Sequence, residues 1–167
     1  MANCGNAGYS GVSVYSGRVE RMFLGQFYHS FDDKGRLTIP VRFRDLLVPD
    51  GAYVMQGFDQ NLMVLPSPTF EFLSHRVNKL SMTDPTARLL RRLVFSTADR
   101  VEVDKVGRIL IPQFLRQMVG VDNQLVVVGM GDYFEIWTPG QWQEQSEKLN
   151  DAQSNPHRFA ALDLSSE

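Results

Sequence analysis

The chain has 167 residues, 43% hydrophobic and 22% charged, with a net charge of −2 and a single cysteine, Cys4, which is typical of a globular protein of one or two small domains. Its short apolar runs exclude a transmembrane helix, which needs roughly 20 apolar residues, and one cysteine with three scattered histidines excludes an internal disulfide and a zinc site. Residues 18–116 carry 15 Lys and Arg against 11 Asp and Glu, whereas residues 117–167 carry 2 against 8, so an anionic partner is expected to bind the basic part.

Residues 1–21 are rich in Gly, Ser and Asn and show no hydrophobic periodicity. Glycines and serines interrupt every apolar run in this stretch, which argues against a secretory signal, so we expect the protein to stay in the cytoplasm. These residues are predicted to form a flexible N-terminal extension. Folding is expected to begin near Met22, which we also predict to be the first residue of the native protein.

An internal repeat with an offset of 72 residues organises the rest of the chain. Ser30–Leu47 reads SFDDKGRLTIPVRFRDLL and Glu102–Val119 reads EVDKVGRILIPQFLRQMV. Six of these eighteen aligned positions are identical, where chance would give about one. The identical pairs are Asp32/Asp104, Gly35/Gly107, Arg36/Arg108, Ile39/Ile111, Pro40/Pro112 and Arg44/Arg116. The same register continues downstream without a gap, which indicates a duplication.

Each copy is predicted to contain four short strands and one short helix. The first strand, residues 26–31 or 100–103, runs into a turn that contains a glycine able to adopt positive φ. The second strand, residues 36–39 or 108–111, is followed by a proline that begins the helix. Two more strands form a hairpin that closes the unit. One such unit buries little apolar surface, so each copy is expected to pack against its twin.

Three further helices have sequence signals at their first turn. The signals are Ser67-Pro68, Asp84-Pro85 and Thr138-Pro139. Apolar residues follow each signal at helical spacing, so these helices are predicted to be amphipathic covers of the strands. Residues 150–167 are predicted to be a polar C-terminal tail that frays.

These features together resemble the MraZ family, bacterial transcriptional regulators of the division and cell-wall gene cluster and tandem members of the SpoVT/AbrB-like group. The resemblance runs from Met22 to about Leu149 and includes both repeats in order. It rests on the Met22-Phe23-Leu24-Gly25 start, the D-x-x-x-R signatures at Asp32/Arg36 and Asp104/Arg108, the Gly-Arg-(Leu/Ile)-x-Ile-Pro passage in both copies, and the helix Asp84-Pro85-Thr86-Ala87-Arg88 between them.

The resemblance implies a mostly β fold with helices (α+β), a tandem SpoVT/AbrB-like swapped-hairpin β-barrel built from the two internal repeats, with flanking amphipathic helices. Residues 22–82 would hold the first repeat and its following helix, residues 83–98 a connecting helix, and residues 99–149 the second repeat with its helix. It also implies a ring-shaped homo-oligomer that binds double-stranded DNA at short repeated boxes in its own operon promoter and acts there as a nucleoid-associated repressor. Neither a membrane, nor a cofactor, nor a small-molecule ligand is expected as a partner.

The D-x-x-x-R turns carry the predicted DNA contacts. An Asp and an Arg four residues apart across a glycine turn place a carboxylate beside a guanidinium, so the carboxylate can fix the orientation of the Arg. An oriented guanidinium matches the O6 and N7 acceptors of guanine, and lysines contribute point charges for phosphates. The predicted DNA-binding residues are Arg36 and Arg108 as primary contacts, Asp32 and Asp104 as orienters, Lys34 and Lys105 as phosphate contacts, and Gly35 and Gly107 as the turn residues.

The residues alone leave a second interpretation of these turns open. Asp at the start of a tight turn commonly caps its own backbone, and a nearby Arg often makes a weak exposed ion pair. The corresponding alternative function is a protein-interaction or antitoxin-like barrel module without base readout. An enzyme is not expected, because His29 has no nucleophile in a recognisable elbow nearby and the glycines form no phosphate-binding motif.

Other basic and aromatic residues also allow two interpretations, one structural and one functional. Arg44 and Arg116 are expected to pack their stems over the barrel, with a phosphate contact as the alternative. Arg88, Arg91 and Arg92 share one helix face, which is expected to be solvated, with phosphates or a neighbouring subunit as alternative contacts. An aromatic stretch near the second hairpin is expected to belong to the core rather than to a base-stacking platform, because its surroundings are acidic. It comprises Tyr133, Phe134, Trp137 and Trp142.

Overall fold

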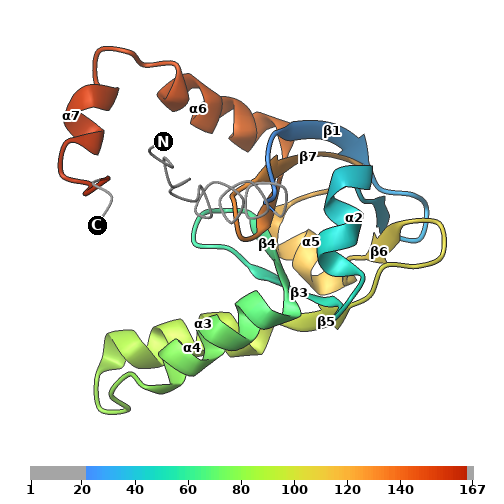
Figure 1. The fold of residues 1–167 in the computed structure, drawn as a ribbon, viewed down its shortest axis with the longest axis horizontal. Coiled ribbons are helices and arrows are strands. Elements are labelled where there is room, and N and C mark those ends of the chain that lie inside the picture. The colour runs from blue at the N-terminus through green and yellow to red at the C-terminus, as the bar shows by residue number, and fades with distance from the viewer. Residues whose placement is uncertain (1–21, 165–167) are drawn as a thin grey trace, which may run out of the picture.

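The computed structural model describes residues 22–164 (Figure 1). The extension predicted for residues 1–21 lies outside these residues, as does the very end of the predicted tail. The strands are β1 (Gln26–Ser30), β2 (Arg36–Thr38), β3 (Ala52–Gln56), β4 (Leu62–Pro66), β5 (Asp99–Val101), β6 (Arg108–Leu110), β7 (Gln124–Gly129) and β8 (Phe134–Trp137). The helices are α2 (Val41–Leu47), α3 (Ser67–Asn78), α4 (Pro85–Thr97), α5 (Gln113–Val119), α6 (Pro139–Leu149) and α7 (Asn155–Phe159).

The predicted fold class, a mostly β fold with helices built from two repeats, is confirmed. Six strands form one antiparallel sheet in the order β1-β7-β8-β4-β3-β5, and β2 and β6 form a separate two-stranded ribbon. The strand hydrogen bonding does not close into a ring, because β1 and β5 are the two edges of the large sheet.

The two repeats exchange strands throughout the sheet. Strand β1 of the first repeat pairs with β7 of the second, and β5 of the second repeat pairs with β3 of the first. Strands β4 and β8 join the two hairpins at the middle of the sheet. The ribbon pairs β2 with β6, one strand from each repeat. Each repeat keeps its own hairpin, β3–β4 or β7–β8, and satisfies the rest of its strand hydrogen bonds with its twin, as the small size of one unit requires.

The main core lies inside this interleaved arrangement. It contains matched residues of both repeats, such as Leu37 and Ile109 from the ribbon and Phe43 and Leu115 from the helices after it, all at most 1% exposed. The aromatic stretch also belongs to the interior: Phe134 is fully buried, and Trp137 packs against Trp142 of α6. This agrees with the prediction that the aromatic stretch belongs to the core.

Helices α3, α4 and α6 cover outer faces of the large sheet. Helices α3 and α4 enclose a second apolar cluster with Met55 and Leu65 of β3 and β4, and α6 lies over β7 and β8. Two of the start signals act as side-chain caps: Asp84 Oδ1 accepts the N–H of Thr86 at 2.8 Å, and Thr138 Oγ1 accepts that of Gln141 at 3.2 Å.

The C-terminal segment contains a helix that the sequence analysis did not name. Residues 155–159 form the short helix α7, which buries none of its residues. Pro156 at its first turn is a helix-start signal that the polar composition concealed. Within residues 22–164, no helix combines the length and apolar character needed to cross a bilayer.

Candidate nucleic-acid interface

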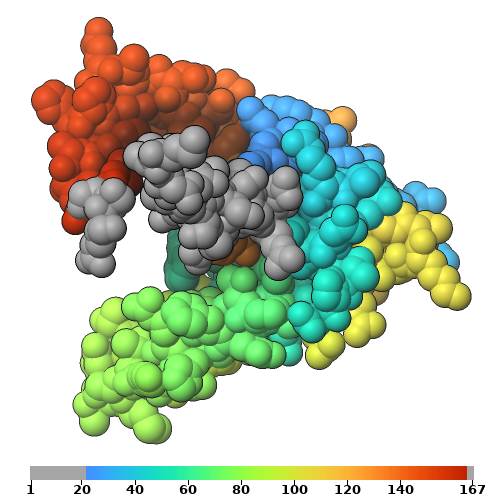
Figure 2. Space-filling model, viewed as in Figure 1, coloured from blue at the N-terminus to red at the C-terminus, as the bar shows by residue number. Residues whose placement is uncertain are grey.

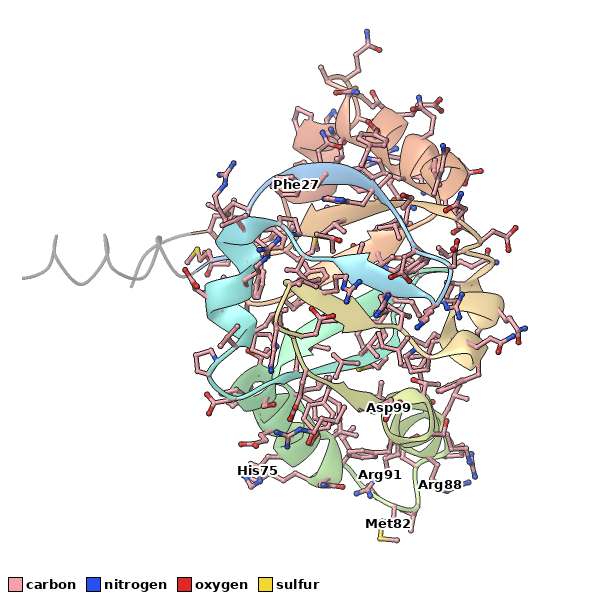
Figure 3. The ribbon with its side chains drawn as sticks, turned by 90° about the vertical axis from the view of Figure 1, so that its right-hand side faces the viewer. Phe27, His75, Met82, Arg88, Arg91 and Asp99 are labelled. Atoms are coloured by element: carbon pink, nitrogen blue, oxygen red, sulfur yellow. The ribbon has the colours of Figure 1, made fainter. Side chains whose placement is uncertain are left out.

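The two D-x-x-x-R turns lie side by side at one end of the molecule, although 72 residues separate them in sequence. Both views place the β1–β2 turn, in blue, beside the β5–β6 turn, in yellow, at the end opposite α7 (Figures 1 and 2). The cause is the ribbon, in which Arg36 opposes Leu110 and Thr38 opposes Arg108. Figure 3 looks onto this end of the molecule.

Each turn has a tightly specified backbone. The N–H of Gly35 donates to the carbonyl of Asp32 at 2.9 Å, and the N–H of Gly107 donates to that of Asp104 at 3.0 Å. The φ angles of the two glycines are +77° and +83°, a left-handed conformation that residues with a side chain rarely adopt. The repeated glycine therefore has a local structural cause in both copies.

The aspartates divide their two oxygens between the turn and the arginine. Asp32 Oδ1 accepts the N–H groups of Lys34 and Arg36, both at 2.9 Å, while Asp32 Oδ2 accepts Nε–H of Arg36 at 2.7 Å. In the second copy, Asp104 Oδ1 accepts the N–H groups of Val106 and Arg108, and its Oδ2 accepts Nε–H of Arg108 at 2.8 Å. Each aspartate therefore caps its own turn and also holds its arginine, an arrangement that is compatible with either interpretation of the turns.

These hydrogen bonds stabilise the charged form of both carboxylates. The backbone N–H of Arg36 is the main cause that lowers the pKa of Asp32 to about 2, with further contributions from the Arg36 side chain and the N–H of Lys34. The pKa of Asp104 is also lowered, chiefly by the backbone N–H of Arg108. Both carboxylates are therefore ionised at neutral pH and able to hold their arginines.

The arginines are half-buried rather than fully extended from the turn tips. Their side chains are 30% exposed for Arg36 and 28% for Arg108. Nη1 of Arg108 also lies 3.6 Å from Oδ2 of Asp32, so the two turns share one carboxylate. Among the residues that the structure describes, no other acceptor binds the terminal nitrogens of either arginine, so donors remain for a ligand.

The predicted lysines lie at the exposed tips, where Lys34 and Lys105 are solvent-accessible. Together with nearby groups they make the end of the molecule basic. The two turns, residues 31–36 and 103–108, and the two arginines that lie against their glycines carry six basic side chains, Lys34, Arg36, Arg44, Lys105, Arg108 and Arg116, and three acidic ones, Asp32, Asp33 and Asp104. A basic surface of this kind attracts a polyanion.

No group of three or more potential metal ligands occurs within residues 22–164.

The arginines of the α3–α4 hairpin do not join this surface. Figure 3 shows Arg88 and Arg91 beside Met82, at the far end of the hairpin. Arg88 Nη1 donates to the carbonyl of Met82 at 3.0 Å, and Arg91 Nη2 donates to that of Asn78 at 2.7 Å. These two side chains bind the carbonyls at the end of α3 and in the following turn. Arg88 is exposed, as expected for a solvated face, whereas Arg91 is partly buried.

Arg44 and Arg116 have a closer relation to the turns than the sequence indicated. Their guanidinium groups lie against the glycines of the two turns, Arg116 at Gly35 and Arg44 at Gly107. The sequence singled these arginines out in one way, because both copies of the repeat have an arginine at this aligned position. Nothing in the sequence shows that each one reaches the turn of the other repeat.

Comparisons with known proteins agree with the repeat. Residues 22–93 and 94–164 each match the family described as "MraZ protein, putative antitoxin-like". A protein of Herpetosiphon aurantiacus named "Transcriptional regulator MraZ" is 45% identical over 130 residues, which are 78% of this chain and 90% of the relative. Proteins of the same name are 45% identical over 128 residues in Thermomicrobium roseum (77% and 89%) and 37% identical over 134 residues in Finegoldia magna (80% and 91%).

Proposed function

The chain belongs to the MraZ family, and from this premise we propose that it is a transcriptional regulator that binds double-stranded DNA through its two D-x-x-x-R turns. The observation that carries the proposal is the pair of turns brought side by side, each with an arginine held by an ionised aspartate. A guanidinium whose Nε is occupied still presents its terminal N–H groups, and the fixed plane suits the two acceptors on the major-groove edge of guanine. Lys34 and Lys105 contact the flanking phosphates.

The wider proposal is that several copies assemble into a ring on DNA. The two turns of one subunit offer two arginines and two tip lysines, which is a small set of contacts for a specific complex. Copies joined in a homo-oligomeric ring place many such turns on neighbouring boxes, and linked sites bind more tightly than single ones. Bound at its own promoter in the division and cell-wall gene cluster, within the nucleoid, the ring acts as a repressor by blocking RNA polymerase.

The substitution Arg36→Ala tests base reading. We expect it to weaken binding to the DNA upstream of the protein's own gene by about 1–3 kcal/mol for each lost guanine contact, while a scrambled fragment is bound as before. The measurement is a gel shift with scrambled competitor, and size-exclusion chromatography confirms that assembly is unchanged. Arg158→Ala, which removes an exposed arginine from α7 at the opposite end, is the matched control. Normal promoter binding by a well-folded Arg36→Ala protein would refute the role of this residue.

The alternative function is an antitoxin-like interaction module, which the description of the matching family supports. In that case the turns stabilise the barrel and do not read bases. Salt dependence separates the two functions, because binding to phosphates weakens steeply as salt rises. A protein that shows neither salt-dependent nor box-dependent binding to the upstream DNA fits the interaction module instead.

A further inference from the structure

The helix arginines Arg44 and Arg116 occupy equivalent places in the two repeats. Arg44 lies on α2, and its Nε donates to the carbonyl of Ile39 at 2.9 Å; Arg116 lies on α5, and its Nε donates to the carbonyl of Ile111 at 3.1 Å. Each carbonyl belongs to the residue just before the proline that precedes the helix. These bonds direct both side chains back along the strand–helix connection of their own repeat.

The guanidinium of each arginine then rests on the turn of the opposite repeat. A Cβ atom added at Gly35 would lie 2.6 Å from Cζ of Arg116, closer than Cβ atoms approach other heavy atoms, and a Cβ at Gly107 would overlap the guanidinium of Arg44. The ribbon produces this approach, because Ile111 donates its N–H to the carbonyl of Gly35 and Ile39 donates to that of Gly107. Arg116 additionally lies over the ring of Phe31, 5.6 Å from its centroid.

This contact shows how closely each guanidinium approaches the glycine backbone, while the positive φ is what requires glycine at these positions. A glycine turn is intrinsically mobile, because the residue has no Cβ to restrict its backbone. A planar cation lying on the open face of the glycine occupies the space into which the turn would otherwise move. The same turn carries the aspartate that holds the DNA-facing arginine, so a displaced turn also displaces that arginine.

We propose that Arg44 and Arg116 are crosswise positioning residues: Arg116 fixes the Asp32–Arg36 turn and Arg44 fixes the Asp104–Arg108 turn. The consequence for DNA rests on the proposed function, whereas the effect on the turns does not. In this role an arginine matters for its shape more than for its charge. Lysine cannot replace it, because a lysine ammonium lacks both the planar surface and the Nε donor.

The positioning role is tested first without DNA, by hydrogen–deuterium exchange on the full-length assembled protein. The reporters are the backbone N–H groups bound by the aspartates, those of Lys34 and Arg36 in one turn and those of Val106 and Arg108 in the other. Arg116→Met should abolish the protection of the first turn only. Arg44→Met should abolish that of the second turn only.

The control is Arg42→Met, which removes the same charge from α2 at an exposed position where the side chain lies near Phe27 instead of a turn. It should leave both turns protected. If Arg44→Met or Arg116→Met prevents folding, Arg44→Lys and Arg116→Lys serve in their place and should give the same crosswise loss. Unchanged protection, or loosening of only the turn in the same repeat, would overturn the proposal.

DNA binding supplies a second readout that distinguishes positioning from a direct phosphate contact. In Arg116→Lys, the ratio of affinities for promoter and scrambled DNA should fall by about fivefold or more, with the salt dependence unchanged. A phosphate contact predicts the opposite, because lysine keeps the charge and therefore the affinity. Retained discrimination in Arg116→Lys, with a flatter salt dependence in Arg116→Met, would overturn the positioning role.

The two proposals can fail separately. If the wild-type protein does not discriminate between DNA sequences, but each arginine variant still loses hydrogen-exchange protection in the turn of the opposite repeat, the DNA function fails and the positioning of the turns stands.

Discussion

At the residue scale, one carboxylate performs two tasks in each turn. Oδ1 of Asp32 closes the turn backbone and Oδ2 orients Arg36, and Asp104 repeats this arrangement. Neither task excludes the other, because an ionised carboxylate can accept several hydrogen bonds at once. The same two residues are therefore expected to matter both for folding of the turn and for the direction of the guanidinium.

Acid should remove this arrangement in a defined pH range. Asp32 has a pKa of about 2 in the folded protein against 3.8 as its ordinary value, so its stabilising effect is complete above about pH 4 and is lost as the pH falls toward 2. We expect the difference in thermal unfolding midpoint between wild type and Asp32→Asn to be constant from pH 7 to about 4 and to shrink below it. A difference that stays constant down to pH 2 would contradict the pKa assignment.

Lys34 contributes charge and no base recognition in the proposed complex. Lys34→Ala should therefore weaken binding to promoter and scrambled DNA alike and reduce the slope of log affinity against log salt by about one for each engaged turn. Titrations at several salt concentrations measure this slope. Lys79→Ala, which removes an exposed lysine at the end of α3, should leave the slope unchanged. If Lys34→Ala also leaves it unchanged, Lys34 is not a contact.

At the element scale, the helices and the turns form largely where local signals predict them. The capping residues Asp84 and Thr138 and the prolines before α2 and α5 mark helix starts that the structure confirms. Strand β8 is different, because the buried acidic residue Glu135 on it interrupts an otherwise apolar run. Nε1 of Trp137 donates a hydrogen bond to Oε2 of Glu135 at 2.8 Å.

Glu135 is expected to reduce stability as the pH rises. Burial is the main cause that raises its pKa above the ordinary 4.5, so the folded state retains the proton to higher pH than the unfolded state does, and the free energy of unfolding falls between 4.5 and the raised pKa. Glu135→Gln keeps an acceptor for Trp137 without the buried charge. Its thermal unfolding midpoint should exceed that of wild type at pH 7, with the advantage shrinking toward pH 4.5. A less stable variant at pH 7 would show that the charge itself is required.

At the scale of the whole molecule, the interleaving of the repeats decides where the predicted DNA-contact residues meet. Because β2 pairs with β6, the two turns and the two helix arginines gather at one end of the molecule. The acidic C-terminal part of the chain ends in α7 at the opposite end (Figure 1). This separation suits a subunit that presents one face to DNA.

Assembly into a ring should appear as strong dependence on the number of boxes. A promoter fragment with several boxes at native spacing should bind about 100-fold or more tightly than a fragment with one box, because the later contacts form within one complex. Titrations of fragments with one, two and three boxes measure the effect. Changing the spacing by half a helical turn is the control, since it turns alternate boxes away from the ring. Equal affinities for all fragments would indicate that each subunit binds alone.

The sequence predicted the parts of the site that depend on neighbouring residues. The glycine turns, the aspartate beside the arginine, and the exposed tip lysines follow from spacings of two to four residues, over which turn geometry is fixed locally. It did not predict that Arg36 and Arg108 would be half-buried, or that Asp32 would also lie near Arg108. These features depend on how two distant turns pack, which no local spacing encodes.

By itself the sequence determined the duplication, the order of strands and helices through α6, and the type of turn in each repeat, because hydrophobic period, caps and glycine conformation act over a few residues. The small size of one repeat also predicted that the two copies pack together, but only the tertiary structure decided which of their strands pair. The pairing of backbone groups 72 residues apart depends on the total burial and hydrogen bonding of the folded chain. That pairing placed Arg116 against Gly35 and Arg44 against Gly107. The sequence therefore identified Arg44 and Arg116 as a matched pair, but it did not show which turn each one contacts.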